Sequence, residues 1–197
     1  MVTGKNADEM KRFAQEANKA ASQLGRTTTD YTKASLIYAQ QGLSDAEIKK
    51  RSEITLKTAN VTGQSTEAVS EELTAVWNGY KASAAEAEIY IDRLAAVAST
   101  TASSLSELST GMSKVAAAAA SLGVGEEQLA AQLSTIISVT RQAPETVGTA
   151  LKTIYSRISD IQAGIDEDGT TLGTYSGKLA ALGIKVLDTS GKLRNMG

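Results

Sequence analysis

The stretch Val139–Ile158 reads VTRQAPETVGTALKTIYSRI and contains the only proline of the chain. Pro144 suits the first position of a helix, because its φ angle is already helical and its missing N–H is not needed there. Glu145 follows in the first turn, where a negative charge faces the partial positive charge of the helix end. The stretch therefore predicts a helix that begins at Pro144.

Apolar residues recur along this helix at the 3.6-residue period of an α-helix. They are Val147, Leu151, Ile154, Tyr155, Ile158 and Ile161. Gly148 interrupts the stripe, and a glycine inside a helix costs about 1 kcal/mol relative to alanine. We interpret Gly148 as a point where another backbone comes close, although a glycine that is merely tolerated would give the same sequence.

Helix-start signals recur at a nearly even spacing along the rest of the chain. Three are capping boxes, in which a serine is followed three residues later by a glutamate: Ser44–Glu47, Ser83–Glu86 and Ser104–Glu107. Asn6–Glu9 is a weaker version, and Ser65, Gly125 and Pro144 mark further starts. Glycines near the opposite ends favour left-handed C-caps, and these are Gly25, Gly42, Gly63, Gly79, Gly123 and Gly164.

These signals predict an all-α fold, a succession of amphipathic helices of about 15–20 residues that form helical hairpins or a bundle. The expected helices cover residues 6–24, 29–41, 44–60, 65–78, 83–101, 104–122, 125–142 and 144–163. After Gly164 the pattern changes to a loop, a short helix at 176–182 and a small C-terminal β-hairpin at 184–196. We therefore expect a helical region at 1–163 and a second segment at 164–197 that continues beyond Gly197.

Large apolar side chains are scarce, since the 197 residues include one Phe, one Trp and six Tyr. Such side chains contribute about 1.5–3 kcal/mol each when fully buried. A single thick core is therefore not expected, and thin contacts between helices, or contacts with other copies of the chain, fit better. The alanine run Ala116–Ala120, with Gly111 before it, favours either close helix approach or simply high helix propensity.

Charge and composition argue against several functions. The 20 basic and 22 acidic residues are interspersed, whereas a nucleic-acid interface needs a clustered basic face. The absence of His and Cys removes the commonest general base and excludes disulfides. The carboxylate pairs Glu71–Glu72, Glu86/Glu88 and Glu126–Glu127 lie at helix starts or on polar faces, which favours solvated charges over a catalytic pair. We expect no enzymatic activity, cofactor, metal site or membrane span.

The block around Pro144 resembles the core region of phage tail tape measure proteins. The matching residues are Thr140, Arg141, Gln142, Thr146, Val147, Gly148, Thr149, Ala150, Leu151, Lys152 and Arg157. The similarity extends upstream to about Leu43, and downstream it includes Leu182–Ile184 and Asp188–Arg194. This resemblance implies a largely helical structural protein of a phage, a prophage or a phage-tail-like particle.

The same resemblance implies a role and a set of partners. A tape measure protein lies in the lumen of the virion tail, sets the length of the tail tube during assembly in the host cytoplasm, and is released during DNA ejection. Its partners would be other copies of itself in an oligomer, the tail tube protein, tail assembly chaperones and baseplate or hub proteins. No sequence-specific contact with nucleic acid is implied.

Trp77–Asn78–Gly79 supports an alternative hypothesis. A Trp-x-Gly turn between two amphipathic helices is similar to the WXG-type helical hairpins, which a specialised bacterial system secretes as dimers. The export signal of that family, a tyrosine followed four residues later by an acid, does not follow Tyr80, Tyr90 or Tyr155. In either hypothesis Trp77 is predicted to anchor a helix core, with Gly79 at the turn.

Overall fold

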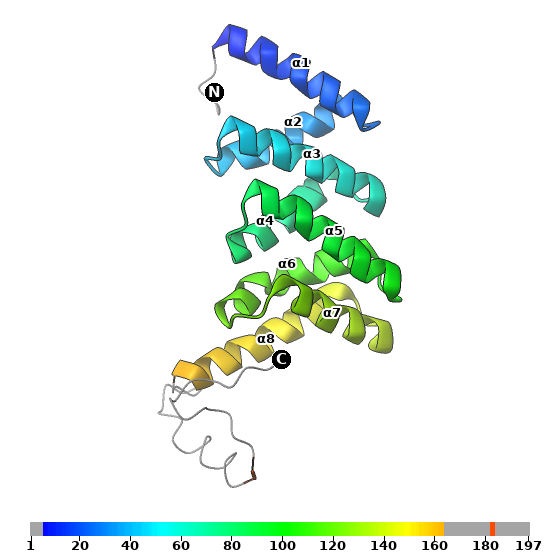
Figure 1. Cartoon of the computed structure of the whole chain (residues 1–197), viewed down its shortest axis with the longest axis vertical. Helices are drawn as coiled ribbons and strands as arrows, with labels where there is room; N and C mark the ends of the chain where they lie inside the picture. Colours follow the sequence, from blue (N-terminus) through cyan, green and yellow to red (C-terminus); the bar gives the residue numbers. More distant parts are fainter. Residues whose placement is uncertain (1–5, 164–181, 184–197) are drawn as a thin grey trace. The chain divides into compact units, whose positions relative to one another are not determined.

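The computed structural model describes residues 6–163 and 182–183. This part of the chain contains eight helices and no strand, and 82% of it is helical, which confirms the all-α class. The helices are α1 Ala7–Gln23, α2 Thr28–Gln40, α3 Asp45–Thr62, α4 Thr66–Tyr80, α5 Ala84–Thr100, α6 Leu105–Ser121, α7 Glu126–Thr140 and α8 Pro144–Ala163 (Figure 1).

The helix starts follow the capping signals of the sequence. Complete capping boxes begin α1, α3, α5 and α6, as predicted. At Ser104 the backbone N–H donates to the Glu107 carboxylate over 2.7 Å, and the Glu107 N–H donates to the Ser104 hydroxyl over 3.1 Å. A further box, Thr27–Asp30, begins α2. This box was not predicted, because an aspartate, with its shorter side chain, stands where glutamate or glutamine is usual.

The helix ends agree with the predicted glycines except near Gly79, and Gly164 lies outside the described residues. Gly25, Gly42, Gly63 and Gly123 have positive φ angles, as expected for left-handed caps. The assignment of Gly79 to a helix end was wrong, because α4 continues through Tyr80 and Lys81 adopts the left-handed conformation with a φ of 55°. Similarly, α7 ends at Thr140 and Arg141 has a φ of 55°.

The chain divides into two compact units, Met1–Thr149 and Ala150–Gly197. In the first unit α2, α4 and α6 form one layer, and α1, α3, α5 and α7 form the other (Figure 1). Most helices contact the helices one and two places away along the chain, and α3 also contacts α6. Burial is therefore distributed over many thin helix-on-helix contacts.

Apolar side chains are buried along the length of the central helices, but only in part along α1. Val69, Leu73, Val76 and Trp77 of α4 are buried, as are Leu105, Leu108, Met112 and Val115 of α6. In α1 Met10 is 42% exposed, and the buried residues are Ala17, Ala20 and Ala21. The stripe of α1 is continuous in sequence, but neighbouring helices cover only its C-terminal half.

The second unit contains the part of α8 from Ala150 to Ala163, and a turn at Leu182 and Gly183, where Gly183 has a φ of +76°. Apart from Leu182, the predicted short helix at 176–182 and β-hairpin at 184–196 lie outside the described residues. The predicted domain boundary between residues 163 and 164 stays a prediction for the same reason.

Candidate functional site

The family-like block begins with the turn between α7 and α8. Thr140 is the last residue of α7, and its side chain accepts a hydrogen bond from the Gln142 N–H over 3.3 Å. Arg141 ends the helix by donating its N–H to the Ile137 carbonyl over 2.9 Å. The Arg141 guanidinium donates to the Ala102 carbonyl over 3.2 Å. The Thr-Arg-Gln segment thus forms the turn that precedes Pro144.

Gly148 lies against the backbone of α6, as its place in the stripe predicted. A Cβ atom at Gly148 would come within 2.4 Å of the Gly111 carbonyl oxygen and 3.0 Å of the Lys114 Cβ. The first distance is too short for any side chain, and the second is tighter than most Cβ contacts. Val147 beside it is buried, whereas Thr146 and Thr149 are exposed. The glycine of the motif is therefore required by the approach of two helix backbones.

The remaining motif residues belong to the second unit. Leu151 is buried, and Ala150, Lys152 and Arg157 are exposed. The predicted stripe is correct for Leu151 and Tyr155, which are buried, and wrong for Ile154, which is 50% exposed.

A second close approach joins α4 to α6, and we call it the α4–α6 seam, formed by Glu72, Gly79, Ser109, Thr110, Ala116 and Ala117. A Cβ atom at Gly79 would come within 2.8 Å of the Ala117 nitrogen and 3.2 Å of the Ala116 Cβ. The alanine run of α6 therefore does allow a close helix approach. Gly79 serves this contact and not a turn.

Hydrogen bonds to Glu72 complete the seam. Its two carboxylate oxygens accept from the Ser109 hydroxyl over 2.7 Å and from the Thr110 hydroxyl over 2.6 Å, both on α6. Gln64 donates its side-chain amide to the same carboxylate over 3.1 Å. Glu72 was predicted to be a solvated charge, and this was wrong because its helical position faces α6.

Trp77 is the largest fully buried side chain, which confirms its predicted role as a core anchor. Its ring lies 4.8 Å from the Arg51 guanidinium carbon and 5.9 Å from the ring of Tyr38. Arg51 also donates to the Ala82 carbonyl over 2.7 Å, and the Tyr38 hydroxyl bonds with Thr55 over 2.7 Å. Burial raises the pKa of Tyr38 to about 12. This cluster ties α2, α3 and α4 together.

A model of the family of phage-related minor tail proteins matches residues 14–197. The chain belongs to this family. It is therefore a component of a phage tail, and association with other tail components follows from that membership. No solved structure matches the chain. The WXG-type alternative rested on a Trp-x-Gly turn, and in this minor tail protein Trp77 and Gly79 both lie within α4.

The acidic residues of this minor tail protein act mainly as caps and ion-pair partners. Hydrogen bonds from Ser83 lower the pKa of Glu86, and bonds from Ser104 lower the pKa of Glu107. Glu88 pairs with Lys50 over 3.4 Å. Within the described residues no group of three or more His, Cys, Asp or Glu side chains is arranged to hold a metal ion. In the same part of the chain no helix is long and apolar enough to cross a membrane.

Proposed function

We propose that this chain is part of a tape measure protein, the tail component that sets the length of the tail tube and leaves with the DNA. One observation carries the proposal: the residues that resemble the tape measure core include Gly148, the glycine on which the α6–α8 approach depends. Family membership supports the coarser role, and the all-helical architecture is compatible with the finer one.

In this proposal the chain acts without catalysis. Many of the described acids are engaged as caps, in ion pairs or in the α4–α6 seam, and the buried polar clusters connect helices. Its place would be the lumen of the tail, with further copies of the chain and the tube, chaperone and hub proteins as its partners. It would contribute its length and its contacts with other copies of the chain.

The way length is counted depends on the state of the helices inside the tube. A continuous helix rises about 1.5 Å per residue, so the 18 and 15 residues of α3 and α4 would span about 50 Å. If the hairpins stay folded, one pair adds only about 8–10 Å, the distance between packed helix axes. The two states therefore predict very different effects of a deletion.

The experiment is an in-frame deletion of Asp45–Tyr80 in the parent gene, with tail lengths measured by electron microscopy. A tape measure role requires shorter tails, by about 50 Å for an extended chain and about 10 Å for folded hairpins. Trp77→Ala is the matched control, because it weakens the fold without changing the number of residues, and its tails should keep their length. Normal-length tails from the deletion would exclude the ruler role for this segment.

A further inference from the structure

Two hollows of opposite charge lie on either side of α5. The first, of about 460 Å³ between α5 and α7, has Glu86, Ile89, Arg93, Glu126 and Glu127 in its lining. The second, of about 280 Å³ between α3 and α5, has Lys49, Lys50, Glu53, Lys57 and Glu88 in its lining. Both hollows belong to the layer of α1, α3, α5 and α7 in the first unit.

The first hollow has an excess of negative charge, with three carboxylates against one guanidinium, and the second has three ammonium groups against two carboxylates. Internal ion pairs compensate these charges only in part. Arg93 pairs with Glu127 over 3.0 Å, and Glu88 pairs with Lys50 and Lys57. Within the described residues no ion pair is found for Glu126 or Lys49.

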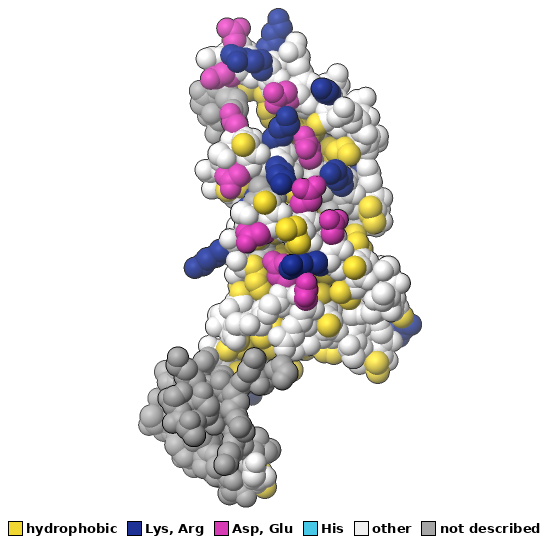
Figure 2. Space-filling view, in the orientation of Figure 1, with side chains coloured by type: hydrophobic (Ala, Val, Ile, Leu, Met, Phe, Trp, Pro, Cys, Tyr) yellow, Lys and Arg dark blue, Asp and Glu magenta, His cyan; other side chains and the backbone are white. Residues whose placement is uncertain are grey.

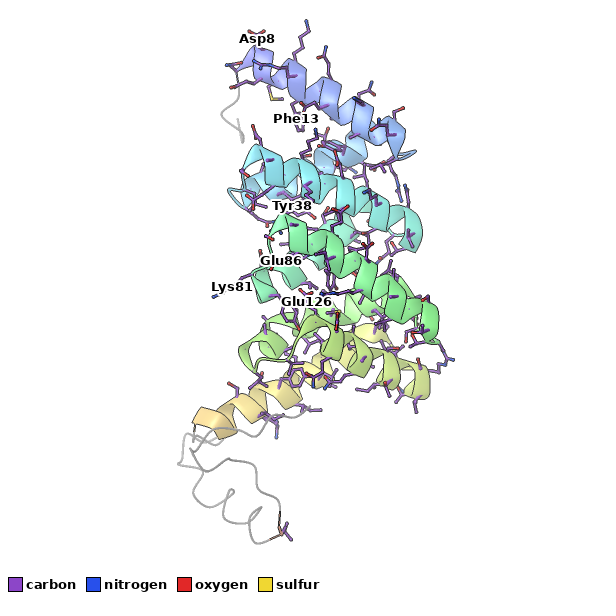
Figure 3. The ribbon with its side chains drawn as sticks, in the orientation of Figure 1. Asp8, Phe13, Tyr38, Lys81, Glu86 and Glu126 are labelled. Atoms are coloured by element: carbon purple, nitrogen blue, oxygen red, sulfur yellow. The ribbon has the colours of Figure 1, made fainter. Side chains whose placement is uncertain are left out.

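Glu126 in particular is compensated only in part. Burial has the largest effect and raises its pKa, the attraction of Arg93 is the next largest and lowers it, and the neighbouring Glu86 and Glu127 raise it further. Figure 3 shows Glu86 and Glu126 at the starts of α5 and α7, the two helices that border the hollow. A further positive charge placed here would therefore be favourable.

The exposed side of α5 forms a ridge between the two hollows, and this ridge is suited to close contact. Ala85 and Ala96 of α5 are exposed and small, and Ile89 is 50% exposed, so a mainly apolar surface, interrupted by Asp92, runs along the outer side of the helix. Figure 2 shows acidic, basic and hydrophobic side chains mixed on one face of the molecule. The face thus combines an apolar ridge with flanks of opposite sign.

We propose that this face binds a second copy of the chain. The two copies are related by a two-fold axis that lies in the interface and runs parallel to α5. Such a rotation lays the acidic α5/α7 hollow of one copy over the basic α3/α5 hollow of the other, and the reverse contact forms at the same time. An interface of this kind is isologous and closes at a dimer. The inference does not depend on the tape measure role.

The first test is sedimentation of the complete 197-residue chain at two salt concentrations. A dimer at about 0.1 M salt should dissociate at about 1 M, because the Debye length falls from about 10 Å to about 3 Å. A chain that is monomeric at the lower salt, or that grows beyond a dimer, overturns the proposal.

Charge reversal then tests the assignment of the face. The variant Glu126→Lys/Glu127→Lys and the variant Lys49→Glu/Lys57→Glu should each be monomeric, since each brings like charges together. When mixed, they should form a one-to-one heterodimer, because both contacts are attractive again. Failure of the mixture to associate would overturn the assignment, even if each variant alone is monomeric.

A matched control separates this effect from helix destabilisation. Asp8→Lys/Glu145→Lys removes two first-turn acids from α1 and α8, outside both hollows, and changes the net charge by the same amount. It should dimerise like the unaltered chain, and its dissociation would count against the proposed face. Circular dichroism confirms folding, and the lysine reversals on the exposed side of α3 provide the test if the acidic variant does not fold.

One residue should have the opposite effect. Asp92 is exposed on α5 between the two hollows, so the two-fold axis brings it towards the Asp92 of the second copy. Asp92→Asn should therefore strengthen the dimer and reduce its dissociation constant severalfold. A weaker dimer would contradict an axis along α5.

Discussion

The helices α1 and α6 have the same length, 17 residues, and each begins with a complete capping box, yet they are held in different ways. In α1 the buried residues are Ala17, Ala20 and Ala21. In α6 eight residues are buried, among them Leu108, Met112 and Val115. The comparison shows that a good local helix signal determines where a helix forms, while its neighbours determine how firmly it is held.

The position of each helix explains the difference. In the described part of the chain the main contacts of α1 are with α2 and α3, whereas α6 contacts α3, α4, α5 and α7. Each helix that borders α6 buries some of its own side chains and some of those of α6, and glycines allow the closest approaches. We therefore expect α6 and the α4–α6 seam to unfold with the whole first unit, and α1 to open locally.

The largest expected change in stability comes from removing Trp77, the core anchor beside the α4–α6 seam. Trp77→Ala should reduce the free energy of unfolding by about 3–5 kcal/mol, the cost of removing a large buried aromatic side chain. Met10→Ala on α1 should change it by less than about 0.5 kcal/mol, since that side chain is 42% exposed. Chemical denaturation followed by circular dichroism measures both, and equal losses would contradict the comparison.

Gly148→Ala tests whether the backbone approach to α6 matters more than helix propensity. Propensity alone would stabilise α8 by about 1 kcal/mol. The new Cβ would lie 2.4 Å from the Gly111 carbonyl oxygen, so we expect a net loss of about 1–3 kcal/mol. Thr149→Ala, at the exposed neighbouring position, is the control for propensity. A Gly148→Ala protein as stable as this control would show that the two backbones are not in contact.

The capping boxes offer the most direct comparison of α1 with α6. Asn6→Ala and Ser104→Ala should each cost about 1 kcal/mol locally. The loss at Ser104 should lower the global stability, while the loss at Asn6 should appear only as faster hydrogen exchange within α1. Hydrogen exchange resolved by residue, alongside thermal unfolding, distinguishes the two. A fall in global stability from Asn6→Ala would mean that α1 unfolds with the core.

The Ser104 capping box also predicts that the stability of the fold depends on pH. Hydrogen bonds from Ser104 lower the pKa of Glu107 in the folded state. This group therefore contributes stability above its unfolded pKa, and the contribution is lost as the pH falls through the folded pKa. Ser104→Ala should make unfolding less sensitive to acid in this range. An unchanged acid profile would argue against the lowered pKa.

The smallest expected effect is a gain in stability. Lys81 ends α4 in the left-handed conformation, which costs a residue with a side chain about 1 kcal/mol or more. Lys81→Gly should relieve this strain and stabilise the fold by up to about 1 kcal/mol. Arg141→Gly should gain less, because the hydrogen bond of Arg141 to Ala102 is lost. Thermal unfolding of both variants measures the difference, and a destabilised Lys81→Gly protein would reveal a further contact of Lys81.

Much of the fold could be predicted because its signals are local. Ser44, Ser83 and Ser104 each cap a helix through a glutamate three residues away, so the helix starts follow from neighbouring residues alone. The same holds for Gly25 and Gly63, whose positive φ angles end helices. Gly79 was misassigned because a glycine that ends a helix and a glycine that permits close packing are identical in sequence.

The sequence by itself determined where the eight helices lie, which family the motif around Pro144 resembles, and that no thick core forms. Only the tertiary structure decided that Gly79 and Gly148 both accommodate α6, that Glu72 bonds across to Ser109 and Thr110, and that two hollows of opposite charge flank α5. The physical reason is the separation in sequence of the residues that interact. Caps and turns act between residues three or four apart, whereas these contacts join residues more than thirty positions apart, and no period in the chain records which helix faces which.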